Sequence, residues 1–346
     1  MSMKFQLAIN MERLDDSIGM SDVAAHTLDM VKMADQGGFS IVWAAEHHAL
    51  EMTIAPNPFQ LLTWWGEHTT SIRLGTAVAV APYWNPIRLA GEAAMTDLIS
   101  GGRLELGIGS GAYQREFDRM HPGLKQTDGW RYMQEILPAV RALWQGDYAH
   151  EGEFWSFPLA TSVPKPVQEN VPVWVSARAP ITFDYAVQHQ CNIMTWPFTR
   201  PMSEAELYME RFSDALSKHP EVARPQLAMM RHAALYDNPD HAQVPIDAAR
   251  RQLGQFENLY KNLDDVVNGF PKQTPFEALE NRAEFDATML NDNLMFGTPD
   301  QIIEKLKPYE ALGVDSFIYY ASLGLDHQSQ KRSLELFCEH VIPAFS

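Results

Sequence analysis

The chain has 346 residues, 46% of them hydrophobic and 11% aromatic, which excludes a disordered chain and leaves room for one large α/β barrel or two medium domains. With 27 Lys and Arg against 44 Asp and Glu, the formal net charge is −17, and a field of this sign disfavours nucleic acid and anionic membranes as partners. Two cysteines are too few for a disulfide framework, and there is neither a signal peptide nor an apolar run of 18 residues, so we expect a cytoplasmic protein.

Strand-like and helix-like segments alternate along the chain. Apolar segments of strand-like composition lie at 5–10, 39–45, 72–81, 103–109, 172–176, 192–196, 226–236 and 314–320. Segments with helical character lie at 22–36, 58–69, 86–99, 128–144, 181–188, 203–218, 299–312 and 329–342. Eight strands, nearly all followed by a helix, predict a (β/α)8 TIM barrel rather than an open doubly wound sheet.

The stretch 237–297 breaks this alternation. It is polar, contains several prolines and carries helical pieces. We interpret it as an insertion near the seventh strand and as a candidate lid, because long irregular segments in compact enzymes are often functional. The prediction for the whole chain is one barrel domain over residues 1–346 with this insertion.

The strand at 39–45 is followed by Glu46, His47 and His48. Adjacent residues on an extended chain point to opposite sides, so the two histidines are poorly placed to chelate one metal, and no nearby ligand completes a set. We therefore predict no metal site. Histidines that merely satisfy hydrogen bonds at a strand end are the plain alternative. The carboxyl end of a barrel strand favours a proton-transfer role instead, because active sites lie at that end.

Three glycines alternate in GIGSGAY, at the end of the strand at 103–109. The spacing is GxGxG and not the GxGxxG of dinucleotide-binding folds. Alternating glycines permit a flat or bulky group to approach the backbone closely, and a turn required only for packing is the alternative.

The segment from Ser176 through Ala177 and Arg178 to Thr182 follows the fifth strand and opens a helix. Backbone N–H groups, the helix dipole, a fixed positive charge and hydroxyls at a helix N-terminus suit a phosphate. An ordinary helix start with a surface arginine is the alternative.

Aromatic residues occur at several expected strand ends and can line a pocket for a flat ring or an apolar substrate. No GxSxG, HExxH or GxxxxGK[ST] motif is present, which argues against a hydrolase or an NTPase. The aromatic candidates are Tyr83, Trp84, Tyr113 and Trp196.

Several stretches, in this order and spacing, resemble the bacterial luciferase family of flavin-dependent monooxygenases, and together they span most of the chain. They are FSIVWAAEHH, APNPFQLL, IRLGTAVAVAPYWNPIRLA, DLISGGRLELGIGSGAYQREF and FGTPDQIIEKLKPYEALGVDSFIYY.

The resemblance implies a TIM barrel that binds reduced FMN at the carboxyl ends of its strands. It also implies that O2 and the flavin form a C4a-(hydro)peroxide that places one oxygen atom on a small organic substrate. A separate NAD(P)H:flavin reductase would supply the FMNH2, and the chain would form a homodimer through the helices at 58–69 and 86–99.

Individual residues follow from the same resemblance. His47 matches the histidine near the reactive edge of the flavin. Glu46, His48, Tyr83 and Trp84 are expected around the substrate pocket because they follow predicted strands, and not because of the resemblance. Tyr113 and Trp196 match family aromatics beside the flavin. A non-proline cis peptide is expected between Ala77 and Val78. Ser176 and Ala177 fall in the flavin-binding loop after the fifth strand.

Two departures from luciferase matter. Gly109 stands where luciferase has a cysteine, which argues against light emission. Ser110 stands where luciferase has an arginine on the FMN phosphate, whereas Arg178 introduces an arginine one loop later. We therefore expect Arg178 and Thr182, with backbone N–H groups and Ser110, to hold the phosphate.

Two other functions remain open at this point: an F420-dependent oxidoreductase that transfers hydride, and a flavin-binding protein without catalysis. The aromatic mouth is compatible with a heterocycle, a cation held by cation–π contacts, a ketone or an aldehyde. The reaction can be hydroxylation, Baeyer–Villiger insertion or ring cleavage.

Overall fold

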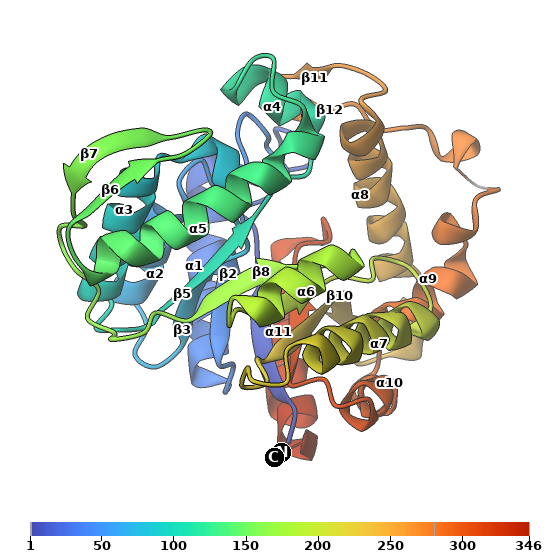
Figure 1. Ribbon diagram of the computed structural model, residues 1–346. Coiled ribbons are helices and arrows are strands. Elements are labelled where there is room, and N and C mark those ends of the chain that lie inside the picture. Colours follow the sequence, from blue (N-terminus) through green and yellow to red (C-terminus); the bar gives the residue numbers. More distant parts are fainter. Residues whose placement is uncertain (1, 280, 346) are drawn as a thin grey trace.

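The computed structural model describes residues 2–279 and 281–345, so residues 1, 280 and 346 of the expected domain lie outside it. Within that part of the chain, eight parallel strands close into a barrel, since β1 pairs with both β2 and β14, β14 with β10, and β10 with β9 (Figure 1). The barrel strands are β1 (Lys4–Ala8), β2 (Ile41–Ala44), β3 (Arg73–Thr76), β5 (Leu104–Gly109), β8 (Val173–Ser176), β9 (Asn192–Thr195), β10 (Leu227–Leu235) and β14 (Ser316–Tyr320).

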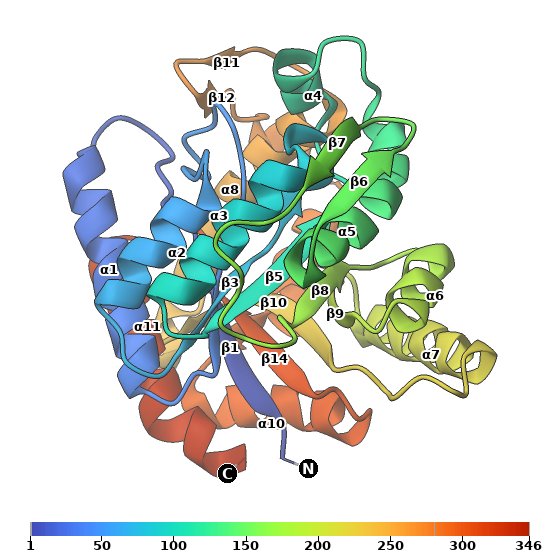
Figure 2. The same ribbon diagram turned by 60° about the vertical axis from the view of Figure 1, so that its left-hand side comes forward.

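Helices surround this barrel, and the predicted (β/α)8 architecture is confirmed. Asn57 and Asn85 cap the helices that follow them by accepting hydrogen bonds from backbone N–H groups, and a proline occupies the first turn of each of these helices. Figure 2 shows α2 and α3 side by side on one flank. The surrounding helices are α1 (Met20–Gln36), α2 (Pro58–Glu67), α3 (Pro86–Ile99), α5 (Gly129–Gln145), α6 (Pro180–Gln188), α7 (Met202–Lys218), α10 (Pro299–Ala311) and α11 (His327–Leu336).

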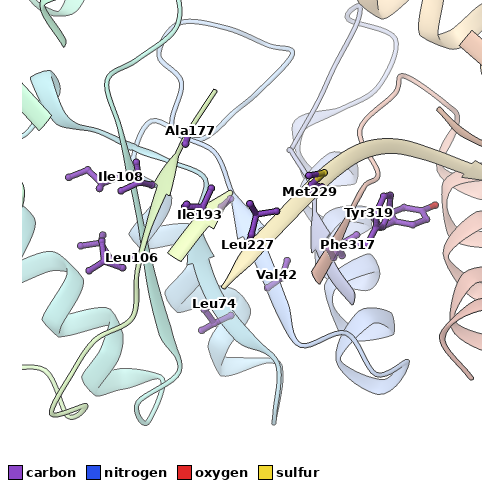
Figure 3. Close-up of a cluster of buried hydrophobic side chains, with 14 of the residues drawn as sticks. Val42, Leu74, Leu106, Ile108, Ala177, Ile193, Leu227, Met229, Phe317 and Tyr319 are labelled. Carbon is purple, nitrogen blue, oxygen red and sulfur yellow. The ribbon is translucent and has the colours of Figure 1, made fainter. Parts of the chain in front are cut away.

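Alternate residues of each strand pack into two different cores. Val42 faces the layer between strands and helices, where Figure 3 shows it among Leu74, Leu106 and Phe317. Its neighbour Trp43 faces the barrel interior instead. This alternation follows from the two-residue period of a strand and explains why these segments are almost wholly apolar, since parallel barrel strands are buried on both sides.

The strand expected at 72–81 is interrupted. It forms β3 and a short β4 (Ala79–Val80), and the peptide bond between Ala77 and Val78 is cis, as expected. Sequence periodicity did not indicate the small elements outside the barrel. They are α4 (Gln114–Met120), the antiparallel hairpin of β6 (Tyr148–Glu151) and β7 (Ser156–Ala160), and β13 (Met295–Gly297), which pairs in parallel with the end of β10.

The segment 237–297 follows β10, the seventh barrel strand. It contains α8 (Gln243–Lys261), a hairpin of β11 (Val266–Val267) and β12 (Phe270–Pro271), and α9 (Ala287–Asn293). Both views place the β11–β12 hairpin beside α4, and the Arg115 side chain donates a hydrogen bond to the Asp264 carbonyl there. No helix of the described residues has the length and apolarity needed to cross a membrane.

Gly107 permits close contact between two barrel strands. A Cβ atom at this position would lie 1.8 Å from the Thr76 carbonyl oxygen, a backbone atom that cannot move aside alone. We predict that Gly107→Ala lowers the free energy of unfolding by about 1–3 kcal/mol through overpacking. Gly146→Ala is the matched control, because a Cβ there meets nothing within 4 Å. Urea unfolding followed by circular dichroism would measure both, and equal stabilities would contradict this interpretation.

Candidate active site

One cavity of about 740 Å³ opens among the carboxyl ends of the barrel strands and α8. Its size suits a cofactor together with a small ligand, since small-molecule pockets span roughly 300–1,000 Å³. Most of the residues singled out in the sequence meet here. Those that line the cavity are Glu46, His47, Ala77, Val78, Gly109, Ser110, Tyr113, Ser176, Arg178, Thr182 and Trp196.

Four of the expected site residues do not line this cavity. Ala177 is buried in the layer between strands and helices (Figure 3). His48 and Trp84 lie behind the lining, where each hydrogen-bonds to the Glu46 carboxylate. Tyr83 packs its ring 5.3 Å from that of His48, measured between centroids. The predicted contact of these four with a ligand stays a prediction. His48 and Trp84 support Glu46, which lines the cavity.

The Glu46 carboxylate connects three segments at the carboxyl end of the barrel. Its Oε2 accepts hydrogen bonds from the Val80 backbone N–H and from Trp84 Nε1, both at 2.7 Å, and its Oε1 lies 2.9 Å from His48 Nε2. Glu46 is 2% exposed, so each of these bonds compensates a charged oxygen that has lost water. The arrangement fixes the path of the chain on either side of His47.

His47 is held by a second buried carboxylate, Glu116 on α4. His47 Nδ1 donates to Glu116 Oε2 at 2.9 Å, and the His48 backbone N–H donates to Glu116 Oε1 at 2.6 Å. With Nδ1 occupied, Nε2 is the ring nitrogen left to face a ligand in the cavity. The His47 ring lies 5.2 Å from the Tyr113 ring, between centroids.

The surroundings of His47 act on its pKa in opposite directions. Burial alone would lower the pKa of His47, but the charge and hydrogen bond of Glu116, with the charge of Glu46, outweigh burial and raise it above its ordinary value. Burial also raises the pKa of Tyr113 well above its ordinary value, so its phenol stays neutral. The site therefore offers a histidine that keeps its proton to higher pH than an ordinary histidine, beside an un-ionised phenol.

The α6 end of the cavity has the features expected of an anion site. The Arg178 guanidinium packs 4.8 Å from the centroid of the Phe198 ring and has no carboxylate partner in the described residues. The Arg178 backbone N–H donates to Thr182 Oγ1 at 3.2 Å, which closes the first turn of α6. A cation, hydroxyls and the N-terminus of a helix thus meet at one edge of the cavity.

The glycine turn and the cis peptide are fitted to each other. A Cβ at Gly109 would lie 2.5 Å from Val78 Cγ2, so a side chain at this position would displace the residue after the cis bond. Gly111 has φ of +85°, a conformation that favours glycine. Gly109 stands where luciferase has a cysteine, and it packs closely against Val78 because it has no side chain.

Sequence reasoning missed several lining or supporting residues. Glu116 was overlooked, although its position three residues after Tyr113, at the start of a helix, is a usable signal. Phe256 and Tyr260 were overlooked as well, although two aromatics four residues apart in a polar helix mark one face. The lining also includes Lys125, Phe198 and Tyr320. Across the described ranges, no group of three or more His, Cys, Asp or Glu side chains is placed to hold a metal ion.

The model of the luciferase-like monooxygenase family matches residues 3–316, which is most of the chain. The chain belongs to the luciferase-like monooxygenase family. It is 38% identical over 345 residues to a protein of Acinetobacter baylyi named flavin-dependent trigonelline monooxygenase, oxygenase component, covering 99% of this chain and 96% of the relative. The enzyme class is accordingly that of a flavin-dependent monooxygenase.

Solved structures share the fold at low sequence identity. The oxygenating constituent of 3,6-diketocamphane monooxygenase from Pseudomonas putida, in complex with FMN, superposes with a TM-score of 0.78 at 17% identity and covers 100% of this chain and 99% of its own. An F420-dependent secondary alcohol dehydrogenase superposes equally well, with a TM-score of 0.78 at 17% identity and 100% of both chains. The fold by itself therefore favours neither cofactor.

The first prediction for the site concerns the proton on His47. In Glu116→Gln the ring keeps a hydrogen-bond partner but loses the adjacent charge, so the pKa of His47 should fall and the ring should lose its proton at lower pH than in the wild type. NMR titration of ¹³C-labelled histidine, assigned with His47→Gln, measures this directly. Glu335→Gln, at an exposed position of α11, is the control and should leave the titration of His47 unchanged. An unshifted His47 in Glu116→Gln would contradict the account.

Proposed function

We propose that this protein is the oxygenase component of a two-component system, which binds reduced FMN delivered by a separate flavin reductase and places one atom of O2 on a small organic substrate. The observation that carries the proposal is His47, which lines a cavity of cofactor size and is held at Nδ1 by Glu116. The family membership and the word "component" in the name of the Acinetobacter relative support it.

The lining fits reduced FMN. Trp196 Nε1 and Thr195 Oγ1 are buried in the cavity wall without hydrogen-bond partners in the described residues, so both are available to polar atoms of a ligand. Arg178 and Thr182 would hold the phosphate at the start of α6, and Ser110 would add a hydroxyl. The glycines at 109 and 111 would let the flavin approach the backbone.

When bound, reduced FMN would supply the two electrons for the activation of O2. This chain's residues then have separate tasks. His47 would donate or accept the proton at Nε2, and Glu116 would keep that proton available by stabilising the charged ring. The aromatic lining would exclude water from the reacting atoms.

Arg178→Ala tests the phosphate site. Removing one charge-assisted hydrogen bond of about 1.5–3 kcal/mol should weaken anaerobic binding of reduced FMN by about 10–100-fold. Reduced riboflavin, which lacks the phosphate, should bind wild type and variant alike, so it controls for the loss of packing on Phe198. Undiminished affinity for reduced FMN in the variant would refute this assignment.

His47→Ala tests the proposed proton transfer. We expect coupled oxygenation to fall about 10²-fold or more while reduced FMN still binds. Product formed per flavin oxidised, measured beside the affinity for FMN, separates chemistry from binding. Full coupling in His47→Ala would show that another group handles the proton. Trigonelline, which appears in the name of the Acinetobacter relative, is the first substrate to assay.

Binding of F420 is the alternative, because solved structures of both cofactor types share this fold. Parallel anaerobic titrations with reduced FMN and reduced F420 decide between them. We expect tight binding of reduced FMN only, and the reverse result would move the assignment to hydride transfer.

We also propose a homodimer through α2 and α3. Three apolar side chains on α3, Met95, Leu98 and Ile99, are 45%, 47% and 51% exposed, which is unusual for one helix of a soluble domain. Val163 and Val167, in the segment that packs against α3, are exposed too. A second copy covering this face would bury them together.

A further inference from the structure

Arg231 on β10 is wholly buried outside the cavity. It is 0% exposed, and its Nε donates to the Tyr309 hydroxyl of α10 at 2.9 Å. The residue before it, Met230, lines the cavity. Since successive strand residues point to opposite faces, Arg231 points away from the cavity, into the layer between the strands and the helices.

The Arg231 guanidinium has no acidic partner among the described residues. Its Nη1 donates to the carbonyls of Phe198 at 2.7 Å and of Arg200 at 2.6 Å, and its Nη2 is buried without a hydrogen-bond partner there. Burying a guanidinium against neutral oxygens alone is costly, because no opposite charge replaces the lost water. An apolar side chain would fill the same space at lower cost, so packing does not explain an arginine at this position.

Arg231 holds the segment 196–201, which joins β9 to α7 and which we call the β9 loop. The carbonyls of residues 198 and 200 accept from Arg231, and the carbonyl between them, that of Thr199, accepts from Asn293 Nδ2 of α9 at 2.8 Å. Three successive carbonyls of the loop are therefore held by two side chains from other elements, so the path of the loop depends on these contacts.

Phe198, in the middle of the β9 loop, has a strained backbone. Its φ is +53°, in the left-handed region, where the Cβ of an ordinary residue approaches the backbone too closely. Strain of this kind persists only where the surrounding structure imposes it. The Arg231 guanidinium donates to the carbonyl of this same residue, so it is placed to impose the strained conformation.

The strained conformation places the Phe198 ring beside two residues of the proposed flavin site. The centroid of this ring lies 4.1 Å from that of Trp196 and 4.8 Å from the Arg178 guanidinium. All three side chains line the cavity. Phe198 thus supports both an aromatic wall of the cavity and the cation to which we assign the phosphate.

We propose that Arg231 is a positioning residue for flavin binding, which acts through the β9 loop and does not touch the flavin. It imposes the left-handed conformation of Phe198 and so fixes Trp196 and Arg178 in the arrangement that binds. This proposal rests on the proposed function, because it takes Trp196 and Arg178 as flavin contacts. Without Arg231 the loop relaxes, since residues 198–200 are at least partly exposed and their carbonyls can turn to water. The binding arrangement is then a minor population, which lowers the affinity in proportion.

Arg231→Met tests the proposal, because it keeps an apolar stem and removes all three hydrogen bonds. Anaerobic titrations with reduced FMN and with reduced riboflavin should both show an affinity lower by about 5–30-fold, the range expected if binding must drive the loop back into a strained conformation. Arg178→Ala, in contrast, should weaken the binding of reduced FMN alone. Loss of affinity for both flavins is thus the signature of a displaced loop.

Arg103→Met is the matched control. Arg103 also donates to backbone carbonyls, those of Gly66, Ile72 and Ser100, but it directly precedes β5, at the opposite end of the barrel from the cavity. Its loss should lower the thermal stability and leave both flavin affinities unchanged. A merely stabilising role for Arg231 would give this same result.

Trp196 provides a second measurement, which needs no ligand. In protein labelled with 5-fluorotryptophan, the ¹⁹F resonance of Trp196, assigned by its loss in Trp196→Phe, should shift in Arg231→Met and stay in place in Arg103→Met. If circular dichroism shows that Arg231→Met does not fold, Arg231→Gln takes its place in both measurements.

The positioning role and the proposed function fail in different ways. A folded Arg231→Met with wild-type affinity for both flavins, or with an unshifted Trp196 resonance, overturns the role of Arg231 and leaves the oxygenase proposal standing. If the wild type binds neither flavin, the proposed function fails and the role in flavin binding fails with it, and a shifted Trp196 resonance would then assign Arg231 to the loop alone.

Discussion

The site depends on two carboxylates buried at the carboxyl end of the barrel. A buried carboxylate is costly unless each oxygen finds a donor, and Glu46 and Glu116 find theirs only if three segments take one particular path. Those segments are the residues that follow β2, β4 with the turn to Trp84, and α4. The same hydrogen bonds that satisfy the carboxylates therefore position His47 and set its protonation.

This constraint accounts for the small departures from an ideal barrel. The cis peptide bond at Ala77–Val78 lies between β3 and β4, and the Val80 N–H of β4 donates to Glu46. Gly109 accommodates Val78 across the next strand. The short α4 is needed to bring Glu116 under the histidine pair. Each irregularity lies beside one of the two carboxylates or in the wall of the cavity. The remaining strands are buried on both faces, as in other parallel barrels.

Features that depend on local sequence patterns could be predicted from the sequence, whereas contacts between segments far apart in the chain could not. The barrel was predictable because apolar strand segments and helical spacing repeat along the chain, and His47 was predictable because it ends a strand. The cis bond followed from the family resemblance and not from periodicity. Glu116 and Phe256 were not found, since their positions depend on how loops and α8 fold back over the barrel. Ala177, directly after β8, is buried in the layer between strands and helices, whereas its neighbours Ser176 and Arg178 line the cavity.

We propose that two regions of one cavity have separate tasks: the start of α6 binds an anion, and His47 with Glu116 handles a proton. The central claim is that the protein binds reduced FMN beside His47 and controls its reaction with O2. The most direct measurement is stopped-flow mixing of the anaerobic protein–FMNH2 complex with O2. The account predicts an absorbing intermediate that outlives the reoxidation of free flavin and decays slowly. Reoxidation as fast as that of free FMNH2, with and without substrate, would contradict it.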